Sequence, residues 1–129
     1  MTRKLPVNPA GAPLPAGPYT PAIVAGGFVF VSGQSPKLPG TRDTVEGDIK
    51  VQTRQVLENI RSILAAAGST MADVVKVNAH LADMKDFAAY NQVYKEYFPE
   101  PYPARTTVQS GLPGDFGVEI DVIALAPQG

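Results

Sequence analysis

The sequence predicts an α+β protein in which two helices cover one face of a mixed sheet. Segments 49–67 and 87–98 carry apolar side chains at helical spacing. Shorter segments before, between and after them alternate or form brief apolar runs, as strands do, and the predicted order is β-β-α-β-α-β-β. Two helices can cover only one face of such a sheet, so the other face must contact solvent or another chain.

The first part of the chain is predicted to be an arm followed by a hairpin. Residues 1–18 are rich in proline and glycine and indicate an extended arm with room for a short edge strand. Residues 20–24 and 28–32 are apolar runs separated by an Ala-Gly-Gly turn, which is typical of a β-hairpin. Residues 33–47 form a long polar loop, and loops of this length in compact domains are usually functional or mobile.

The first helix has the clearest pattern in the chain. Its apolar stripe consists of Ile49, Val56, Leu57, Ile60, Ile63, Leu64 and Ala67. Asp48 is suited to be the N-cap residue, because its carboxylate can accept from the first free backbone N–H groups. Gly68 follows the stripe where a C-terminal glycine commonly ends a helix.

The second half of the chain alternates strands with the second helix. Strand 74–81 is predicted to place Val75, Val77, Ala79 and Leu81 on one face and Lys76, Asn78 and His80 on the other. Asp83 and Asp86 have N-cap spacing before helix 87–98, which Pro99 stops. Segments 106–108 and 118–125 are the last predicted strands. In the latter, Val118, Ile120, Val122 and Ala124 alternate with Glu119, Asp121 and Ile123.

Composition excludes several kinds of protein. Eleven Lys and Arg against twelve Asp and Glu give a net charge of -1 without any basic run, which argues against a nucleic-acid partner. Without cysteine there is no disulfide, zinc thiolate site or cysteine nucleophile, and a single histidine argues against a histidine-based metal site. No window approaches the roughly 20 apolar residues of a membrane span. We therefore expect one cytoplasmic domain over residues 1–129, with no membrane association.

Arg105 is the residue whose position is most suggestive of function. It follows a proline-punctuated loop and begins a β-branched, strand-like segment. A planar and permanently charged fork at such a junction suits two-point capture of a carboxylate. Taken alone, the same residue is more readily explained as a solvated surface arginine, and the rest of the chain is what favours a functional role.

Several short motifs in order along the chain resemble one family. They are Gly17-Pro18-Tyr19, Val31-Ser32-Gly33-Gln34, Gln52 to Ala67 with Asn59 inside it, Asp86-Phe87-Ala88, Asn91 with Tyr94, Pro103-Ala104-Arg105, and Val118-Glu119-Ile120. Together they are similar to the Rid family, the reactive-intermediate deaminases also called YjgF-type or endoribonuclease L-PSP-like proteins. The resemblance implies a chorismate-mutase-like protomer in a homotrimer, with the sheets forming an inner barrel and with ligand clefts between subunits.

The activity that the resemblance implies is hydrolysis of 2-enamine and 2-imino acids such as 2-aminoacrylate. The products would be a 2-keto acid and ammonia, and no cofactor is implied. In this family Arg105 would bind the substrate carboxylate, and Glu119 would hold or activate the attacking water as a general base. Tyr19 would line the cleft and orient the substrate or the water.

The resemblance implies further substrate-binding residues. Ser32, Gly33 and Asn91 match pocket positions, and Gly33 would allow close backbone approach. Thr107 stands where many members carry a cysteine, which leaves the subfamily and the substrate range open. We expect His80 to be a surface or helix-packed residue without a catalytic role. The aromatic side chains of the second helix are expected in the core or at an interface.

Three other functions remain open from the sequence. One is a specialised deaminase of the same superfamily, such as a 2-aminomuconate deaminase. A second is an RNA-cleaving translation inhibitor, although the acidic balance and the single histidine argue against it. A third is a non-catalytic trimer that binds a carboxylate through Arg105.

Overall fold

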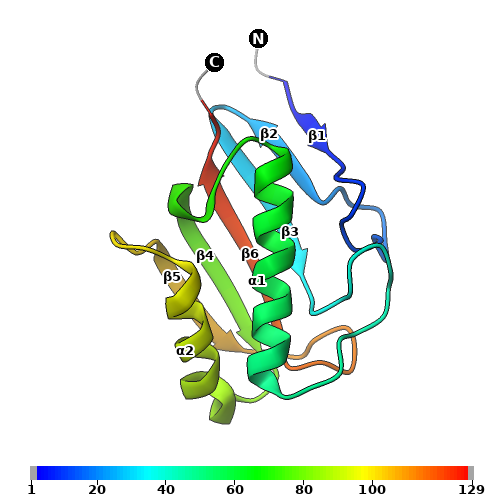
Figure 1. Cartoon of the computed structure of the whole chain (residues 1–129), viewed down its shortest axis with the longest axis vertical. Coiled ribbons are helices and arrows are strands. Elements are labelled where there is room, and N and C mark those ends of the chain that lie inside the picture. The colour runs from blue at the N-terminus through cyan, green and yellow to red at the C-terminus, as the bar shows by residue number, and fades with distance from the viewer. Residues whose placement is uncertain (1–2, 128–129) are drawn as a thin grey trace.

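The computed structural model of the chain describes residues 3–127. Its elements are β1 (Leu5–Val7), β2 (Ala22–Ala25), β3 (Phe28–Gln34), α1 (Ile49–Ala66), β4 (Val74–Leu81), α2 (Phe87–Tyr97), β5 (Ala104–Gln109) and β6 (Val118–Leu125), with short 3-10 turns at Met71–Asp73 and Met84–Asp86. The strands form one sheet in the order β1-β2-β3-β6-β4-β5, in which only the β4–β5 pair is parallel among the described strands. Both helices lie on the same face of this sheet (Figure 1), so the predicted α+β architecture is confirmed.

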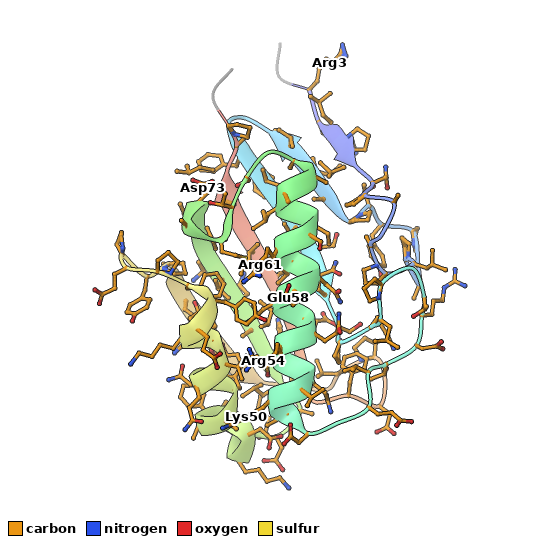
Figure 2. The ribbon with its side chains drawn as sticks, in the orientation of Figure 1. Arg3, Lys50, Arg54, Glu58, Arg61 and Asp73 are labelled. Carbon is orange, nitrogen blue, oxygen red and sulfur yellow. The ribbon has the colours of Figure 1, made fainter. Side chains whose placement is uncertain are left out.

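Helix α1 begins and ends where its caps predict. The Val51 N–H donates to Oδ1 of Asp48 at 3.1 Å, which satisfies one of the free donors at the start of the helix. Gly68 adopts a left-handed conformation with φ of +78°, the geometry that glycine tolerates best after a helix. The outer side of the helix is charged, and Lys50, Arg54, Glu58 and Arg61 follow it in Figure 2.

The core lies between the two helices and the sheet. Helix α1 buries Val56, Leu57, Ile60, Ile63 and Leu64, while β4 and β6 bury Val77, Ala79, Leu81, Val118, Ile120 and Val122. Each of the larger side chains contributes about 1.5–3 kcal/mol by leaving water. The opposite face of the sheet is not covered by this chain, and it exposes Phe28, Phe30 and Leu125 among polar side chains. We call it the open face.

Three details differ from the prediction. Val75 is exposed rather than buried with Val77, because the β4–β6 register shifts between Val74 and Lys76 and turns one extra residue outward. Strand β3 continues through Gly33, which the sequence placed in the following loop. Strand β5 begins at Ala104, so Arg105 lies within a strand.

The predicted edge strand in the N-terminal arm is present as β1. It pairs antiparallel with β2 at the end of the sheet opposite to β5. Within residues 3–127, neither helix combines the length and the apolar composition that a membrane crossing requires.

Candidate functional site

Arg105 reaches from the edge strand β5 toward helix α2. In the parallel register it stands beside Val77, which is buried beneath the helices, so its side chain is on the helix face of the sheet. Its Nη1 donates to Oδ1 of Asn91 at 2.7 Å. The guanidinium carbon is 4.5 Å from the ring centroid of Tyr94, a cation–π distance. Asn91 and Tyr94 are three positions apart on α2, and they hold the arginine fork from two directions.

The guanidinium of Arg105 is available to an external anion. The described residues offer it no carboxylate partner, since the ion pairs among them join other residues. It lines a groove of about 500 Å³ together with Asn91, Tyr94, Lys95, Tyr102 and Pro103, which we call the Arg105 groove. Most of the guanidinium N–H groups remain unused after the bond to Asn91. The groove therefore suits a small carboxylate.

Thr107 lies on the same face but does not line this groove. Its hydroxyl is 3.1 Å from the hydroxyl of Tyr90, which is buried between α2 and the sheet. Burial raises the pKa of Tyr90, so the phenol remains neutral at physiological pH. The Thr107 hydroxyl therefore interacts with Tyr90 and lies outside the lining of the Arg105 groove.

Tyr94 carries a buried hydroxyl without a hydrogen-bond partner among residues 3–127. Burial is the main reason that the pKa of Tyr94 rises to about 12, and the charge of Arg105 opposes this shift only in part. In the unfolded chain the phenol ionises near 10, so the folded protein loses stability as the pH rises from about 10 toward 12.

We expect Tyr94→Phe to be neutral or stabilising below pH 10, by up to about 1 kcal/mol, because it removes an unsatisfied buried hydroxyl. Above pH 10 the variant should lose less stability than the wild-type protein. Urea unfolding at pH 8 and pH 11 measures both effects. A loss of 1 kcal/mol or more at pH 8, roughly the value of one hydrogen bond, would mean that the hydroxyl has a partner, and would contradict this description.

Glu119 lies on the opposite side of the sheet from Arg105. It stands across from His80 in the β4–β6 register, and both side chains point to the open face. Glu119 lines a cleft of about 610 Å³. Its other lining residues are Ala16, Tyr19, Ser32, Gly33, Ser35, Lys37, Pro113 and Phe116. We call this the Glu119 cleft, and it brings together Tyr19, Ser32, Gly33 and Glu119 of the predicted set.

Gly33 leaves the space that the Glu119 carboxylate occupies. A Cβ at this position would lie 2.6 Å from Oε2 of Glu119, far inside van der Waals contact. The carboxylate is the end of a flexible side chain, so it would move away before the backbone did. Gly33 therefore fixes where the carboxylate points.

We expect Gly33→Ala to fold with nearly unchanged stability and to displace the Glu119 carboxylate. If Glu119 acts on substrate, turnover should fall about tenfold or more, because misplacement by an ångström weakens catalysis strongly. Thermal unfolding and turnover of the same preparation measure the two effects. Full turnover in a folded Gly33→Ala protein would show that this carboxylate position is not required.

Ser32 and Tyr19 present different hydrogen-bonding groups to the Glu119 cleft. The Ser32 hydroxyl donates to the Thr20 carbonyl at 2.6 Å, which leaves its lone pairs to accept from a ligand. The Tyr19 hydroxyl accepts from the Ala16 N–H at 3.2 Å, which leaves its own proton to donate. The side chain of Tyr19 is well exposed.

The two predicted halves of the site do not meet within one chain. Arg105 and Asn91 lie on the helix face at the β5 edge, while Glu119 and Tyr19 lie on the open face. The sheet lies between them, because the Arg105 groove is on its helix face and the Glu119 cleft is on its open face. A ligand can therefore contact Arg105 and Glu119 at the same time only where the Arg105 groove of one copy of the chain lies against the Glu119 cleft of a second copy.

The sequence did not single out several residues that line these cavities, among them Lys37, Phe116 and Tyr102. Lys37 and Phe116 lie in loops and carry no periodic signal, although both line the Glu119 cleft. Tyr102 lines the Arg105 groove, and its closeness to Arg105 in the sequence was the available signal. His80 is half-buried on the open face, where its Nδ1 is 3.1 Å from the Ser110 hydroxyl, so it does not pack on a helix.

Comparison with known proteins finds relatives over nearly the whole chain. The family model described as Endoribonuclease L-PSP matches residues 10–126. A RutC family protein of Pyrococcus horikoshii is 57% identical over 114 residues, which cover 88% of this chain and 90% of that protein. The matched residues include both the Arg105 groove and the Glu119 cleft.

Solved structures give the same result. RidA from an Antarctic Psychrobacter bacterium superposes with a TM-score of 0.89 at 42% identity, covering 94% of this chain and 98% of that chain. Escherichia coli TdcF, solved with bound serine, superposes with a TM-score of 0.88 at 36% identity, covering 96% and 100% of the two chains.

Proposed function

The chain belongs to the endoribonuclease L-PSP family, which includes RutC and Rid proteins, and from this premise we propose that it hydrolyses 2-enamine and 2-imino acids to 2-keto acids and ammonia. The observation that carries the proposal is the guanidinium of Arg105, which has no carboxylate partner among the described residues. Asn91 and the Tyr94 ring hold it at the edge of an open groove.

In this proposal Arg105 binds the carboxylate that every 2-imino acid carries. Two parallel N–H donors of the fork match the two carboxylate oxygens and fix the direction of the adjacent imine carbon. Support comes from the related TdcF, which was solved with serine, an amino acid with the same α-carboxylate. Asn91 accepts from the remaining side of the fork and prevents it from rotating.

Glu119 activates the water that attacks the imine carbon. The water oxygen bonds to C2, its proton passes to the carboxylate, and the C=N electron pair moves to nitrogen, which takes up a proton. In the resulting carbinolamine the C–N bond breaks, the hydroxyl proton passes by way of the carboxylate to the departing nitrogen, and the products are ammonia and the 2-keto acid. An enamine enters the same sequence after protonation at C3. The free hydroxyl proton of Tyr19 can donate to the imine nitrogen or to the water.

A second copy of the chain completes the site in this proposal. Since Arg105 and Glu119 lie on opposite faces of the sheet, the β5 edge of one copy must lie against the Glu119 cleft of the next. A closed homotrimer provides this contact in a repeated head-to-tail manner, and it covers the exposed Phe28, Phe30 and Leu125 of the open face.

The experiment that tests the proposal is a coupled assay. An amino-acid oxidase generates 2-imino acids, semicarbazide traps those that persist, and the semicarbazone absorbance measures the imine that the protein has not hydrolysed. We expect the wild-type protein to lower the semicarbazone yield in proportion to its concentration. An unchanged yield with every imine tested would reject the deaminase.

RNA cleavage is tested with the same preparations, because the family description names an endoribonuclease. The net charge of -1 and the absence of a basic run give the chain little attraction for phosphates. We expect that any RNA cleavage in these preparations is the same for the wild-type protein and for Glu119→Gln. If the wild-type protein cleaves RNA and Glu119→Gln does not, RNA cleavage and not imine hydrolysis would be the function of the Glu119 cleft.

A further inference from the structure

Lys37 is a cation in the Glu119 cleft that the proposed reaction does not use. It lies in the loop after β3, and its side chain is half-buried. It lines the cleft together with Tyr19, Phe116 and Glu119. The reaction itself needs only one cation for the α-carboxylate, which Arg105 supplies. A second cation in the same composite site therefore requires its own explanation.

The position of Lys37 is built from the helix and the loop. The buried Asn59 of α1 donates from Nδ2 to the Lys37 carbonyl at 2.8 Å. Lys37 also forms an isolated bridge with Thr44 across the loop. Because a buried side chain and a backbone pairing both hold this residue, its ammonium is presented at a defined place and not on a mobile tip.

The ammonium of Lys37 has donors left for a ligand. Nζ donates to the Thr44 hydroxyl at 2.9 Å and lies 5.0 Å from the ring centroid of Phe116. Within residues 3–127 it forms no ion pair. An ammonium has more than one N–H group, so at least one can reach an anion in the cleft. The ring of Phe116 attracts the Lys37 ammonium by a cation–π interaction and shields one side of it from water.

A second cation adjoins the cleft and strengthens its attraction for anions. Arg42 lines a small neighbouring pocket that shares Tyr19, Gly33 and Lys37 with the Glu119 cleft. Its guanidinium donates to the Pro15 carbonyl at 3.3 Å and forms no ion pair among the described residues. The linings of the two adjoining pockets together contain two cations, Lys37 and Arg42, and one carboxylate, Glu119. An excess of positive charge in a cleft concentrates anionic ligands.

We infer that the Glu119 cleft selects 2-imino acids whose side chain carries a second carboxylate, and that Lys37 binds this distal carboxylate. The inference rests on the proposed function, because it places C2 of the substrate at Glu119 and the α-carboxylate at Arg105. The side chain of the substrate then extends along the cleft that Lys37 and Phe116 line. A neutral side chain would cover the half-buried ammonium without giving it an anionic partner, and this cost would make the site discriminate against neutral substrates.

The test compares an acidic and a neutral imine of equal chain length. Glutamate with L-glutamate oxidase supplies 2-iminoglutarate, and norvaline with L-amino-acid oxidase supplies the neutral analogue. We expect wild-type kcat/KM to favour 2-iminoglutarate, and Lys37→Met to lower the acidic-to-neutral ratio about tenfold, the loss of one charge-assisted hydrogen bond. Lys37→Arg should retain part of the preference. Lys50→Met removes the same charge from the outer side of α1 (Figure 2) and should leave the ratio unchanged.

A binding measurement separates this inference from the proposed function. Calorimetry with 2-oxoglutarate and with 2-oxopentanoate should show tighter binding of the dicarboxylate to the wild-type protein and loss of this difference in Lys37→Met. If no imine is hydrolysed but this Lys37-dependent difference persists, the deaminase is rejected and the site for a second carboxylate stands. Equal binding of the two keto acids to the wild-type protein would overturn the inference, because the cleft would then not recognise a second carboxylate. An equal loss of both imine activities in Lys37→Met would also overturn it, because Lys37 would then act on catalysis through Glu119 and not on the substrate side chain.

Discussion

Arg105→Ala is expected to lower kcat/KM for every 2-imino acid by about a thousandfold. The variant loses two charge-assisted hydrogen bonds to the substrate carboxylate, each contributing roughly 1.5–3 kcal/mol, and about 1.4 kcal/mol corresponds to a factor of ten. The coupled semicarbazone assay measures the loss. The fold should persist, because Arg105 lies on the edge strand β5 and is not itself part of the hydrophobic core, although its side chain makes a hydrogen bond to Asn91 and stacks on aromatic rings of α2.

Two further variants show whether the loss of activity in Arg105→Ala comes from the planar guanidinium at this position. Arg105→Lys retains the charge but not the planar fork, so we expect it to recover only a small part of the activity. Arg61→Ala removes a guanidinium that pairs with Glu58 on the outer side of α1, and it should be fully active. An Arg105→Ala protein with wild-type activity would reject the role of this residue and the mechanism with it.

Glu119→Gln is expected to lower kcat by a factor of roughly 100 to 10,000, the range of general-base catalysis. The amide keeps the size of the carboxylate and cannot take a proton from water. Binding of a 2-keto acid should change little, because Arg105 provides the carboxylate contact. Steady-state turnover and calorimetric titration with pyruvate measure the two quantities.

Asp121→Asn is the matched control for this prediction. Asp121 lies two residues further along β6 on the same open face, and its Oδ1 accepts from Nδ2 of Asn78 at 3.1 Å. It does not line the Glu119 cleft, so its replacement should leave turnover unchanged. Equal losses of turnover and of keto-acid binding in Glu119→Gln would assign Glu119 to positioning instead of proton transfer.

The sequence predicted those features that depend on local pattern. Helix α1 is bounded by Asp48 and Gly68, because caps act through the nearest backbone groups. Helical spacing also placed Asn91 and Tyr94 on one side of α2, where both contact Arg105. The alternation in β6 correctly assigned Glu119 to the polar face, since period-two patterns identify the faces of a strand.

Features that depend on register or on loops could not be predicted in this way. The shift beside Val74 that turns Val75 outward arises from pairing with β6, which the strand itself does not encode. The placement of Arg105 and Glu119 on opposite faces follows from the parallel pairing of β5 with β4. Lys37 reaches the cleft only because Asn59 and Thr44 hold its loop, and loop positions carry no periodicity.

The measurement that tests the shared site most directly is complementation between two inactive variants. Arg105→Ala and Glu119→Gln chains carrying different tags are co-expressed, and the mixed assembly is isolated through both tags and assayed with one imine. If each site takes Arg105 from one copy and Glu119 from another, every closed trimer that contains both variants has both groups in roughly one of its three sites, whichever variant is present twice. We therefore predict roughly a third of wild-type activity for the doubly purified assembly. Activity no higher than that of either variant alone, in an assembly shown to contain both chains, would contradict a site shared between copies.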